Sequence, residues 1–409
     1  MATIAETAPP PPDLDPALVF DFDLYDDRRF VTSGGIFEAM GDLRDKAPDV
    51  FWSTSLGGFW VIQGYNAIVE AAKRGDLFTS SRMGIPPTTD DGRQRRRLAP
   101  LNYDPPDHAA LRSPLNPMFT PAAMNKWSGH IRKLAVELIE KVRPNGQADM
   151  FDEVTEQLPV LIFIDLMGLK RSDYRFYRAL AKAAVASQDR DERYDAMLQA
   201  YQLLKAEIEE RRAAPKDDLI TRLLDLEVEG KPITDELALA YLELLFIAGL
   251  DTVANAMTFA VRYLAMDQAL QQRLRDDPAK IPHAMEELLR RHAVAPVMRT
   301  VTRDETWRGF TFRAGDPVLL NYSAANLDER MFEHGREVDI DRERINHVAF
   351  GAGHHRCLGR NLARIEIVIF FEELLSRLPT FRLAPGEEIP MRGGSVMSIG
   401  RLPLVWDAG

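Results

Sequence analysis

The sequence predicts a mainly α-helical fold with small β-sheets, an α+β class, in a single domain that spans residues 17–409. Two kinds of observation indicate this class. Apolar residues recur at helical spacing over most of the chain. Strand-like runs between turn residues are short and few, and no linker-like stretch divides the chain. We expect helices at 65–73, 122–142, 154–167, 173–186, 192–212, 217–226, 234–266 and 281–291, and strands at 59–62, 306–312 and 317–322.

Composition restricts the class of function. The chain of 409 residues carries a formal net charge of −11, which argues against general nucleic-acid binding. Residues Met1–Pro16 are rich in proline and contain no apolar run, so we expect a disordered tail. The single cysteine excludes internal disulfides and fits a reducing compartment. We find no signal-peptide pattern and no continuous apolar run of about 18 residues, which predicts a cytoplasmic protein without a membrane span.

The segment at 80–101 is predicted to be a loop, because glycines and prolines interrupt it. It contains the basic run Arg93-Gln94-Arg95-Arg96-Arg97. Asp104-Pro105-Pro106-Asp107-His108 then opens a helix, with prolines where a missing N–H is tolerated. His108 and Arg112 are four residues apart and therefore share one face of that helix. A solvated pair is the ordinary interpretation of this spacing.

The longest expected helix follows Thr234, a residue type that suits an N-cap, and continues to about Met266. At 1.5 Å per residue it would be roughly 48 Å long. Gly249 interrupts it beside Asp251-Thr252, and a glycine inside a helix costs about 1 kcal/mol relative to alanine. Two interpretations are open: close packing against another helix, or local opening of the helix over a cofactor.

Two features toward the C-terminus also carry predictions. The helix at 281–291 contains Glu287 and Arg290 at i, i+3, a pair that stabilises many helices. The stretch Gly393–Val405 is predicted to form a terminal hairpin.

The stretch Phe350–Gly359 contains the only cysteine, Cys357, among closely spaced glycines. Glycine permits a positive φ and close backbone approach, so we expect a tight loop. Apolar residues at helical spacing follow, which predicts a helix beginning at the cysteine. Unpaired N–H groups and the helix dipole would then lower the pKa of the thiol. A thiolate held in such a loop is suited to bind iron.

Two other interpretations of this stretch are a buried structural cysteine and a zinc site. Free cysteines are often small buried side chains. A zinc site would use His347, His354, His355 and Cys357, but adjacent residues do not converge easily on one tetrahedron.

Phe350–Gly359 resembles the haem-binding signature of the cytochromes P-450, Phe-x-x-Gly-x-(Arg/His)-x-Cys-x-Gly, at every fixed position. Ala248–Thr252 resembles the oxygen-activation motif of the same family. The resemblance implies the cytochrome P-450 fold, with haem b (iron protoporphyrin IX) between the long central helix and the cysteine-loop helix. It implies that Cys357 is the axial ligand of the iron and that Asp251 and Thr252 deliver protons, with Arg178 as a candidate partner of Asp251.

The resemblance also assigns further residues. Glu287 and Arg290 would form the buried structural pair of the family. The cofactor contacts would be His108, Arg112, Arg299, His355, Phe350, Gly351, Gly359 and Gly249. The substrate pocket would be lined by Leu101, Leu244, Ile247, Val294, Ala295, Val396 and Met397, with part of Met83–Ile85 as its roof.

The chain is most similar to the soluble bacterial class that includes camphor monooxygenase. This implies a monooxygenase that hydroxylates a small, mostly apolar terpenoid or norisoprenoid with O2. Electrons would come from a separate [2Fe-2S] ferredoxin and its NAD(P)H-dependent reductase, and we expect a monomer. The ferredoxin would dock on a basic patch. That patch would comprise Arg112, Arg342, Arg344, Arg360 and Arg364.

One departure leaves the substrate open. Arg95-Arg96-Arg97 stands where the camphor enzyme has the tyrosine that anchors its substrate, so camphor is not expected. An arginine of the Arg93–Arg97 run could instead turn inward and bind the carboxylate of an aromatic or aliphatic acid. Two further functions also stay open: a haem protein that binds a small molecule without oxidising it, and a peroxide-driven enzyme.

Overall fold

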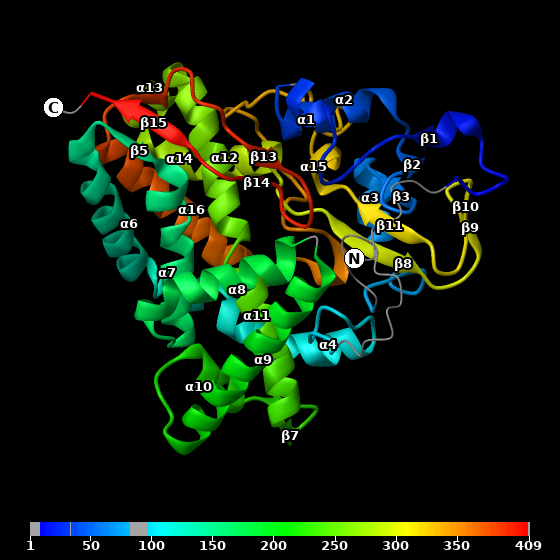
Figure 1. Ribbon diagram of the computed structural model, residues 1–409, viewed down its shortest axis with the longest axis horizontal. Helices are drawn as coiled ribbons and strands as arrows, with labels where there is room; N and C mark the ends of the chain where they lie inside the picture. The colour runs from blue at the N-terminus through cyan, green and yellow to red at the C-terminus, as the bar shows by residue number, and fades with distance from the viewer. Residues whose placement is uncertain (1–8, 33, 82–95, 188, 408–409) are drawn as a thin grey trace.

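A computed structural model describes residues 9–32, 34–81, 96–187 and 189–407. Most helices gather on one side of the molecule and the largest sheet lies on the other, as Figure 1 shows. The mainly α-helical class with small sheets is therefore confirmed. The helices are α1 (Arg29–Thr32), α2 (Ile36–Lys46), α3 (Tyr65–Ala71), α4 (Asp107–Arg112), α5 (Pro121–Asn125), α6 (Ser128–Val142), α7 (Gln157–Met167), α8 (Tyr174–Ala186), α9 (Arg190–Ala213), α10 (Leu219–Leu224), α11 (Asp235–Gly249), α12 (Thr252–Met266), α13 (Gln268–Asp276), α14 (Ile281–Arg291), α15 (Tyr322–Ala325) and α16 (Arg360–Arg377).

The largest sheet has six strands in the order β1-β2-β3-β11-β8-β4, and a three-stranded sheet has the order β12-β15-β5. β3 and β11 run parallel although more than 250 residues separate them in the chain. The sheet therefore combines strands from the N-terminal part of the chain with strands from residues 297–320. The strands are β1 (Val19–Phe20), β2 (Val50–Ser53), β3 (Phe59–Ile62), β4 (Phe78–Thr79), β5 (Gln147–Asp149), β6 (Glu227–Val228), β7 (Lys231–Pro232), β8 (Val297–Val301), β9 (Glu305–Trp307), β10 (Phe310–Phe312), β11 (Pro317–Leu320), β12 (Phe381–Leu383), β13 (Met391–Arg392), β14 (Ser398–Ile399) and β15 (Pro403–Trp406).

The central helix is divided into α11 and α12 at Leu250-Asp251. A Cβ atom added to Gly249 would lie 2.5 Å from the ring of Phe163 on α7. Gly249 therefore packs closely against a neighbouring helix, and the helix also opens beside it. The close-packing interpretation is confirmed, whereas an opening of the helix over a cofactor stays a prediction.

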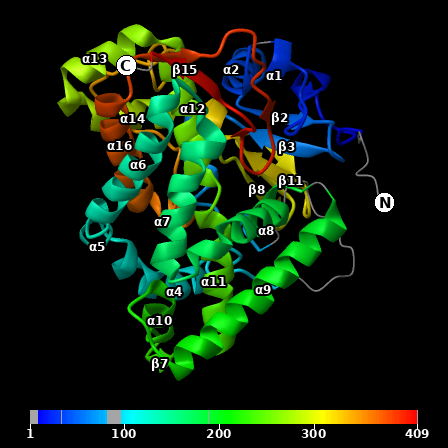
Figure 2. The same cartoon turned by 60° about the vertical axis from the view of Figure 1, so that its left-hand side comes forward.

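Asp235–Met266 is long and apolar enough to cross a membrane by length and composition alone. Half of its most apolar window is buried within the protein, as in the core helix of a globular fold. In Figures 1 and 2, α11 and α12 run through the middle of the helical side, and α9 runs along the outside in Figure 2. The helix therefore forms part of the core here.

The buried pair of Glu287 and Arg290 connects α14 to the chain that leads toward Cys357. Both side chains are fully buried, and two hydrogen bonds of 2.8 Å join them. The Arg290 guanidinium also donates to the carbonyl oxygens of Asn326, Gly335 and Glu337, each at 2.6 Å. This arginine therefore fixes three points of one irregular segment.

Other expectations about the elements also differ from the structure. The expected strand at 306–312 is a hairpin formed by β9 and β10. The predicted helix at 122–142 is broken between α5 and α6 near Lys126. The predicted hairpin at Gly393–Val405 is wrong, because β14 pairs with β13 and β15 joins a different sheet with β5 and β12. In the predicted tail, residues 1–8 lie outside the described part of the chain, whereas Asp13 lies 3.3 Å from Arg313.

Candidate functional site

The cysteine loop is held by backbone contacts that suit its glycines. The Cys357 N–H donates to the carbonyl oxygen of Phe350 at 2.8 Å and closes the loop. Gly351 and Gly353 have φ values of 74° and 67°, the left-handed region that favours glycine. A Cβ atom on Gly353 would lie 2.2 Å from the carbonyl oxygen of Ala72. The loop therefore requires glycine at Gly353 for both conformation and space.

The helix α16 begins at Arg360, so the expectation that it begins at Cys357 was wrong by three residues. The Cys357 side chain is exposed on one side of its loop, yet protein atoms surround the thiol closely enough to desolvate it. This desolvation raises the pKa of the thiol, and the backbone N–H groups of Gly359 and Arg360 oppose that rise. The expected lowering of this pKa was therefore wrong, because desolvation exceeds the contribution of the helix terminus. A metal ion that binds the sulfur deprotonates the thiol outright.

The zinc interpretation receives no support in the described part of the chain. No group of three or more His, Cys, Asp or Glu side chains is arranged there to hold a metal ion. His347 instead lies 3.1 Å from the Glu286 carboxylate. Cys357 thus has no set of protein partners that would complete a tetrahedral zinc site among these residues.

Basic side chains gather beside the cysteine loop. The rings of His108 and His355 lie 4.3 Å apart, and burial together with nearby arginines lowers the pKa of His108 to about 4 and that of His355 to about 2. Arg299 is 4% exposed and raises the positive potential at both imidazoles. Arg112 is near enough to lower the pKa of the same two histidines.

This cluster fits an anionic group. The Nε2 atom of His108 is buried and has no hydrogen-bond partner among the described residues. The neighbouring carboxylate, Asp104, already accepts hydrogen bonds from the Ser80 N–H at 3.0 Å and from the Thr79 hydroxyl. An orphaned imidazole nitrogen among arginines and histidines matches the carboxylate chemistry of a haem propionate.

One face of the central helix is open although the helix is strongly apolar. Leu244 and Ile247 are half-buried, Ala248 is exposed, and Thr252 is half-buried. These residues recur at intervals of three and four, so they form one stripe along the helix. The Thr252 hydroxyl donates to the Ala248 carbonyl oxygen at 3.3 Å, which turns the hydroxyl group along the open face.

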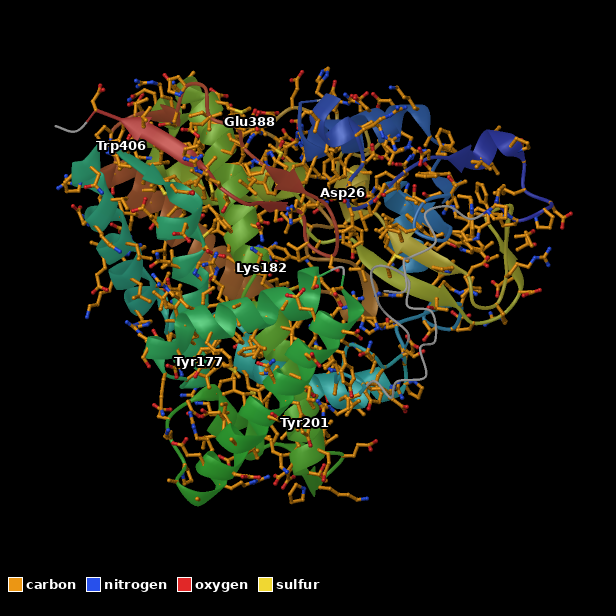
Figure 3. All side chains as sticks on the ribbon, viewed as in Figure 1. Asp26, Tyr177, Lys182, Tyr201, Glu388 and Trp406 are labelled. Atoms are coloured by element: carbon orange, nitrogen blue, oxygen red, sulfur yellow. The ribbon has the colours of Figure 1, made fainter. Side chains whose placement is uncertain are left out.

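Asp251 lies at the break in this helix. Its carboxylate accepts a hydrogen bond of 3.0 Å from the side chain of Asn255. Burial raises the pKa of Asp251, and the positive charges of Lys182 and Arg178 oppose the rise, with the larger effect from Lys182. Figure 3 labels Lys182 on α8, and α8 packs against α11. A carboxyl of raised pKa at a helix break is suited to exchange protons.

Arg178, the expected partner of Asp251, makes its ion pairs elsewhere. Its guanidinium contacts the buried Glu156 and lies 3.6 Å from Asp152. Burial raises the pKa of Glu156 to about 7, and Arg178 opposes that rise. Arg178 therefore contacts a second buried carboxyl directly, and its charge also lowers the pKa of Asp251.

The expected substrate pocket is only partly open. Leu101, Ala295 and Val396 are half-buried, as expected for a lining. Val294 is nearly buried, and its carbonyl oxygen accepts from the Met397 N–H at 2.8 Å. Met397 is fully buried, with its sulfur 3.6 Å from the Ser323 hydroxyl, and its place in the lining stays a prediction. Met83–Ile85 fall outside the described residues.

The basic run is tied into the fold at its C-terminal end, while Arg93–Arg95 fall outside the described residues. The Arg96 guanidinium donates to the Glu243 carboxylate on α11 at 2.6 Å and 3.2 Å. Arg97 donates to the carbonyl oxygen of Asn102 at 2.9 Å. Glu243 was not predicted from the sequence, where its only sign is an acidic residue within the apolar stretch 237–250.

The expected basic patch is divided by ion pairs. Arg342 donates to buried Glu287 at 3.2 Å, and Arg364 makes bonds of 2.6 Å and 2.8 Å with Glu286. Arg344 is exposed and lines a surface cavity of about 540 Å³ together with His283, Glu286, Glu343, Ile345 and Asn346. Arg112 and Arg360 are half-buried beside the cysteine loop.

Comparisons with known proteins agree with this geometry. The model of the family described as Cytochrome P450 matches residues 179–402. The chain is 29% identical to the probable cytochrome P450 127A1 of Sinorhizobium fredii over 98% of both chains. It is 32% identical to the mycinamicin IV hydroxylase/epoxidase of Micromonospora griseorubida, covering 85% of this chain and 89% of that one. The crystal structure of CYP101J2 superposes with a TM-score of 0.88 at 30% identity, covering 98% of this chain and all of that one.

Proposed function

The chain belongs to the cytochrome P450 family, and on that premise we propose that it hydroxylates a small, neutral, mostly apolar molecule. The observation that carries the proposal is the open stripe of Leu244, Ile247 and Ala248 on the central helix, beside Thr252. An apolar surface with few polar groups selects ligands by shape and hydrophobic contact. A terpenoid or norisoprenoid is the class of substrate that we propose.

The protein is a haem-thiolate monooxygenase, and its cofactor is haem b. When bound, the haem supplies the activation of O2 by single-electron steps. Cys357 would bind its iron through the sulfur, and His108, Arg112, Arg299 and His355 would hold its propionates. Phe350, Gly351, Gly359 and Gly249 would lie against the ring. The orphaned His108 nitrogen and the basic cluster support this assignment.

Proton delivery is assigned to Asp251 and Thr252. The Asp251 carboxyl accepts a hydrogen bond from Asn255, and burial raises its pKa, so it holds a proton more readily than a solvated carboxyl does. Thr252 has its hydroxyl on the open face of the helix and can hold or pass on a proton at its Oγ1 atom. An apolar substrate bound over this stripe would exclude bulk water from the open face.

A carboxylate substrate is the second candidate, from an arginine of the Arg93–Arg97 run. The contacts of Arg96 argue against a carboxylate substrate, because its guanidinium is already paired with Glu243. Arg97 is bonded to a backbone carbonyl and lies 3.8 Å from the ring of Tyr103. The relatives do not decide the class, since their names range from a mycinamicin hydroxylase to a methyl-branched lipid omega-hydroxylase.

The enzyme uses O2 and a separate redox partner, as bacterial relatives of this class do. We propose that the partner is a [2Fe-2S] ferredoxin with an NAD(P)H-dependent reductase. Arg112, Arg344 and Arg360 would contribute to a basic docking surface for it. Arg342 and Arg364 would contribute less, because they are already in ion pairs. We further propose a cytoplasmic monomer.

The proposal is tested first on the purified protein loaded with haem. The reduced protein with carbon monoxide should show the Soret band of a thiolate-ligated haem, and the Cys357→Ser variant should lose it. Neutral terpenoids and norisoprenoids should then convert the ferric haem to high spin, and at least one should yield a hydroxylated product with ferredoxin and reductase. A spin shift confined to carboxylates would refute the substrate class, and binding without any product would favour a non-oxidising haem protein.

A further inference from the structure

Arg96, Tyr201 and Glu243 bring together three segments that are distant in the sequence. Glu243 is 1% exposed on α11, and Arg96 is its ion-pair partner. The Arg96 guanidinium also lies 3.4 Å from the centre of the Tyr201 ring on α9. Figure 3 labels Tyr201 on that helix, and α9 packs against α11. The guanidinium is thus held between an aromatic face and a carboxylate.

Arg96 stabilises the charged form of Glu243, whereas Arg96 is in contact with both Glu243 and water. Burial raises the pKa of Glu243, and Arg96 opposes that rise through its hydrogen bond and its charge. The Arg96 side chain remains 45% exposed, so it keeps contact with water as well as with Glu243. Loss of the carboxylate would therefore leave a guanidinium in place on the Tyr201 ring, with free donors and no counter-charge.

This pair lies beside the substrate surface. Glu243 precedes Leu244 by one residue and Ile247 by one helical turn, and both of these belong to the open stripe. A guanidinium at that edge would attract any carboxylate ligand that reached it. In the wild-type protein, the Glu243 carboxylate already accepts the hydrogen bonds from Arg96 that such a ligand would need. The pair also presents no net charge to a neutral ligand.

We propose that Glu243 is a specificity-determining residue. Its carboxylate pairs with the Arg96 guanidinium and thereby excludes carboxylate ligands from the substrate pocket. The inference rests on the proposed function, since it concerns the same pocket. It adds that selectivity for neutral ligands depends on one internal carboxylate. A purely structural ion pair would stabilise the fold without changing the preference between charged and neutral ligands.

The test uses haem-loaded protein and pairs of ligands with one hydrocarbon skeleton, such as perillyl alcohol and perillate. Dissociation constants are measured from the spin-state change of the ferric haem. Glu243→Gln keeps the shape of the side chain and removes its charge. We expect it to bind the carboxylate of each pair about ten- to a hundredfold more tightly than wild type, the range of a hydrogen bond to a charged group. The neutral member should change by less than about threefold.

Two further variants identify the guanidinium that is responsible. Glu243→Gln combined with Arg96→Gln should lose the gain, because no free guanidinium remains. Glu243→Gln combined with Arg97→Gln is the matched control and should keep it, since Arg97 bonds to Asn102 and not to Glu243. Should Glu243→Gln fail to bind haem, Arg96→Gln alone gives the mirror test. At alkaline pH it should tighten the binding of a quaternary ammonium analogue, because the Glu243 carboxylate would then lack its partner. Alkaline pH is needed because burial, without the opposing charge of Arg96, raises the pKa of Glu243 further.

The outcomes separate this inference from the proposed function. If wild type binds the neutral ligands and Glu243→Gln gains no carboxylate affinity, the inference is overturned and the substrate class stands. If wild type already prefers the carboxylate of each pair, both are overturned. A gain that persists without Arg96 also overturns the inference, because another cation would then be the one that Glu243 controls.

Discussion

Replacing Arg290 by lysine removes hydrogen bonds while it keeps the positive charge. Arg290 and Glu287 are both fully buried, and Arg290 donates five hydrogen bonds of 2.6–2.8 Å. Three of these reach the backbone carbonyl oxygens of Asn326, Gly335 and Glu337. A lysine has one nitrogen atom with three donors, so at least two of the five acceptors lose their partner.

The expected loss of stability follows from those acceptors. Each buried polar group left without a partner costs about 1–3 kcal/mol, and two of them cost about 2–6 kcal/mol. Native proteins are stable by only about 5–15 kcal/mol, so this single change should remove a large part of the stability.

The effect should extend to the haem site, because Asn326 links the two regions. Its side-chain oxygen accepts from the Val348 N–H at 2.8 Å, and the Val348 carbonyl oxygen accepts from the Gly351 N–H at 2.9 Å. Arg290→Lys should therefore lower haem retention as well as stability. Urea unfolding followed by circular dichroism measures the first effect, and transfer of haem to an apoprotein acceptor measures the second.

Arg273→Lys is the matched control. Arg273 is 53% exposed and makes one ion pair of 2.7 Å with Asp341 on the surface. Such pairs contribute about 0–1 kcal/mol, so this variant should behave like wild type. If Arg290→Lys also stays within about 1 kcal/mol of wild type, the reasoning from unpaired buried acceptors is refuted.

Three other predictions concern the site and the charge near it. Gly353→Ala should reduce haem content severalfold in cell extracts, because its Cβ would meet the Ala72 carbonyl oxygen at 2.2 Å; normal content would show that the loop adapts. Thr252→Ala should keep O2 consumption but lower the yield of hydroxylated product per O2, and unchanged coupling would count against its role in proton transfer. Glu156→Gln should be more stable than wild type at pH 8. The folded-state pKa of Glu156 is about 7 against a reference of 4.5, so wild type loses stability as pH rises between these values. That difference is about 3 kcal/mol at most and should vanish below pH 4.5; urea titrations at both pH values that give equal gaps would contradict it.

The sequence predicted those features that depend on nearby residues. Helix α14 has the bounds expected from its apolar spacing, Ile281–Arg291, and Thr234 caps the central helix with a hydrogen bond of 3.3 Å to the Leu237 N–H. Both depend on residues within a few turns. The cysteine loop was also predictable, because its glycines are required within a stretch of ten residues.

Features that depend on distant parts of the chain could not be predicted in this way. Arg96 and Glu243 are 147 residues apart, and no local pattern links them. Met397 follows Val396 directly in the chain, yet it is fully buried, and its contacts are with Val294 and Ser323 from distant segments. The strand β15 pairs with β5 from the middle of the chain, which is why a local hairpin was the wrong expectation.

The pKa shifts at the site also depend on distant parts of the chain. The N–H groups of Gly359 and Arg360 lower the pKa of Cys357, as the sequence predicted, but burial raises it by more. The same order holds for Asp251 against Lys182, and for Glu243 against Arg96. The N–H groups near Cys357 could be predicted from its motif, whereas Lys182 and Arg96 could not be predicted as partners from local spacing. The desolvation comes from all the segments packed around each group. Packing therefore sets the sign of these shifts, and the charged partners make the smaller, opposing contribution.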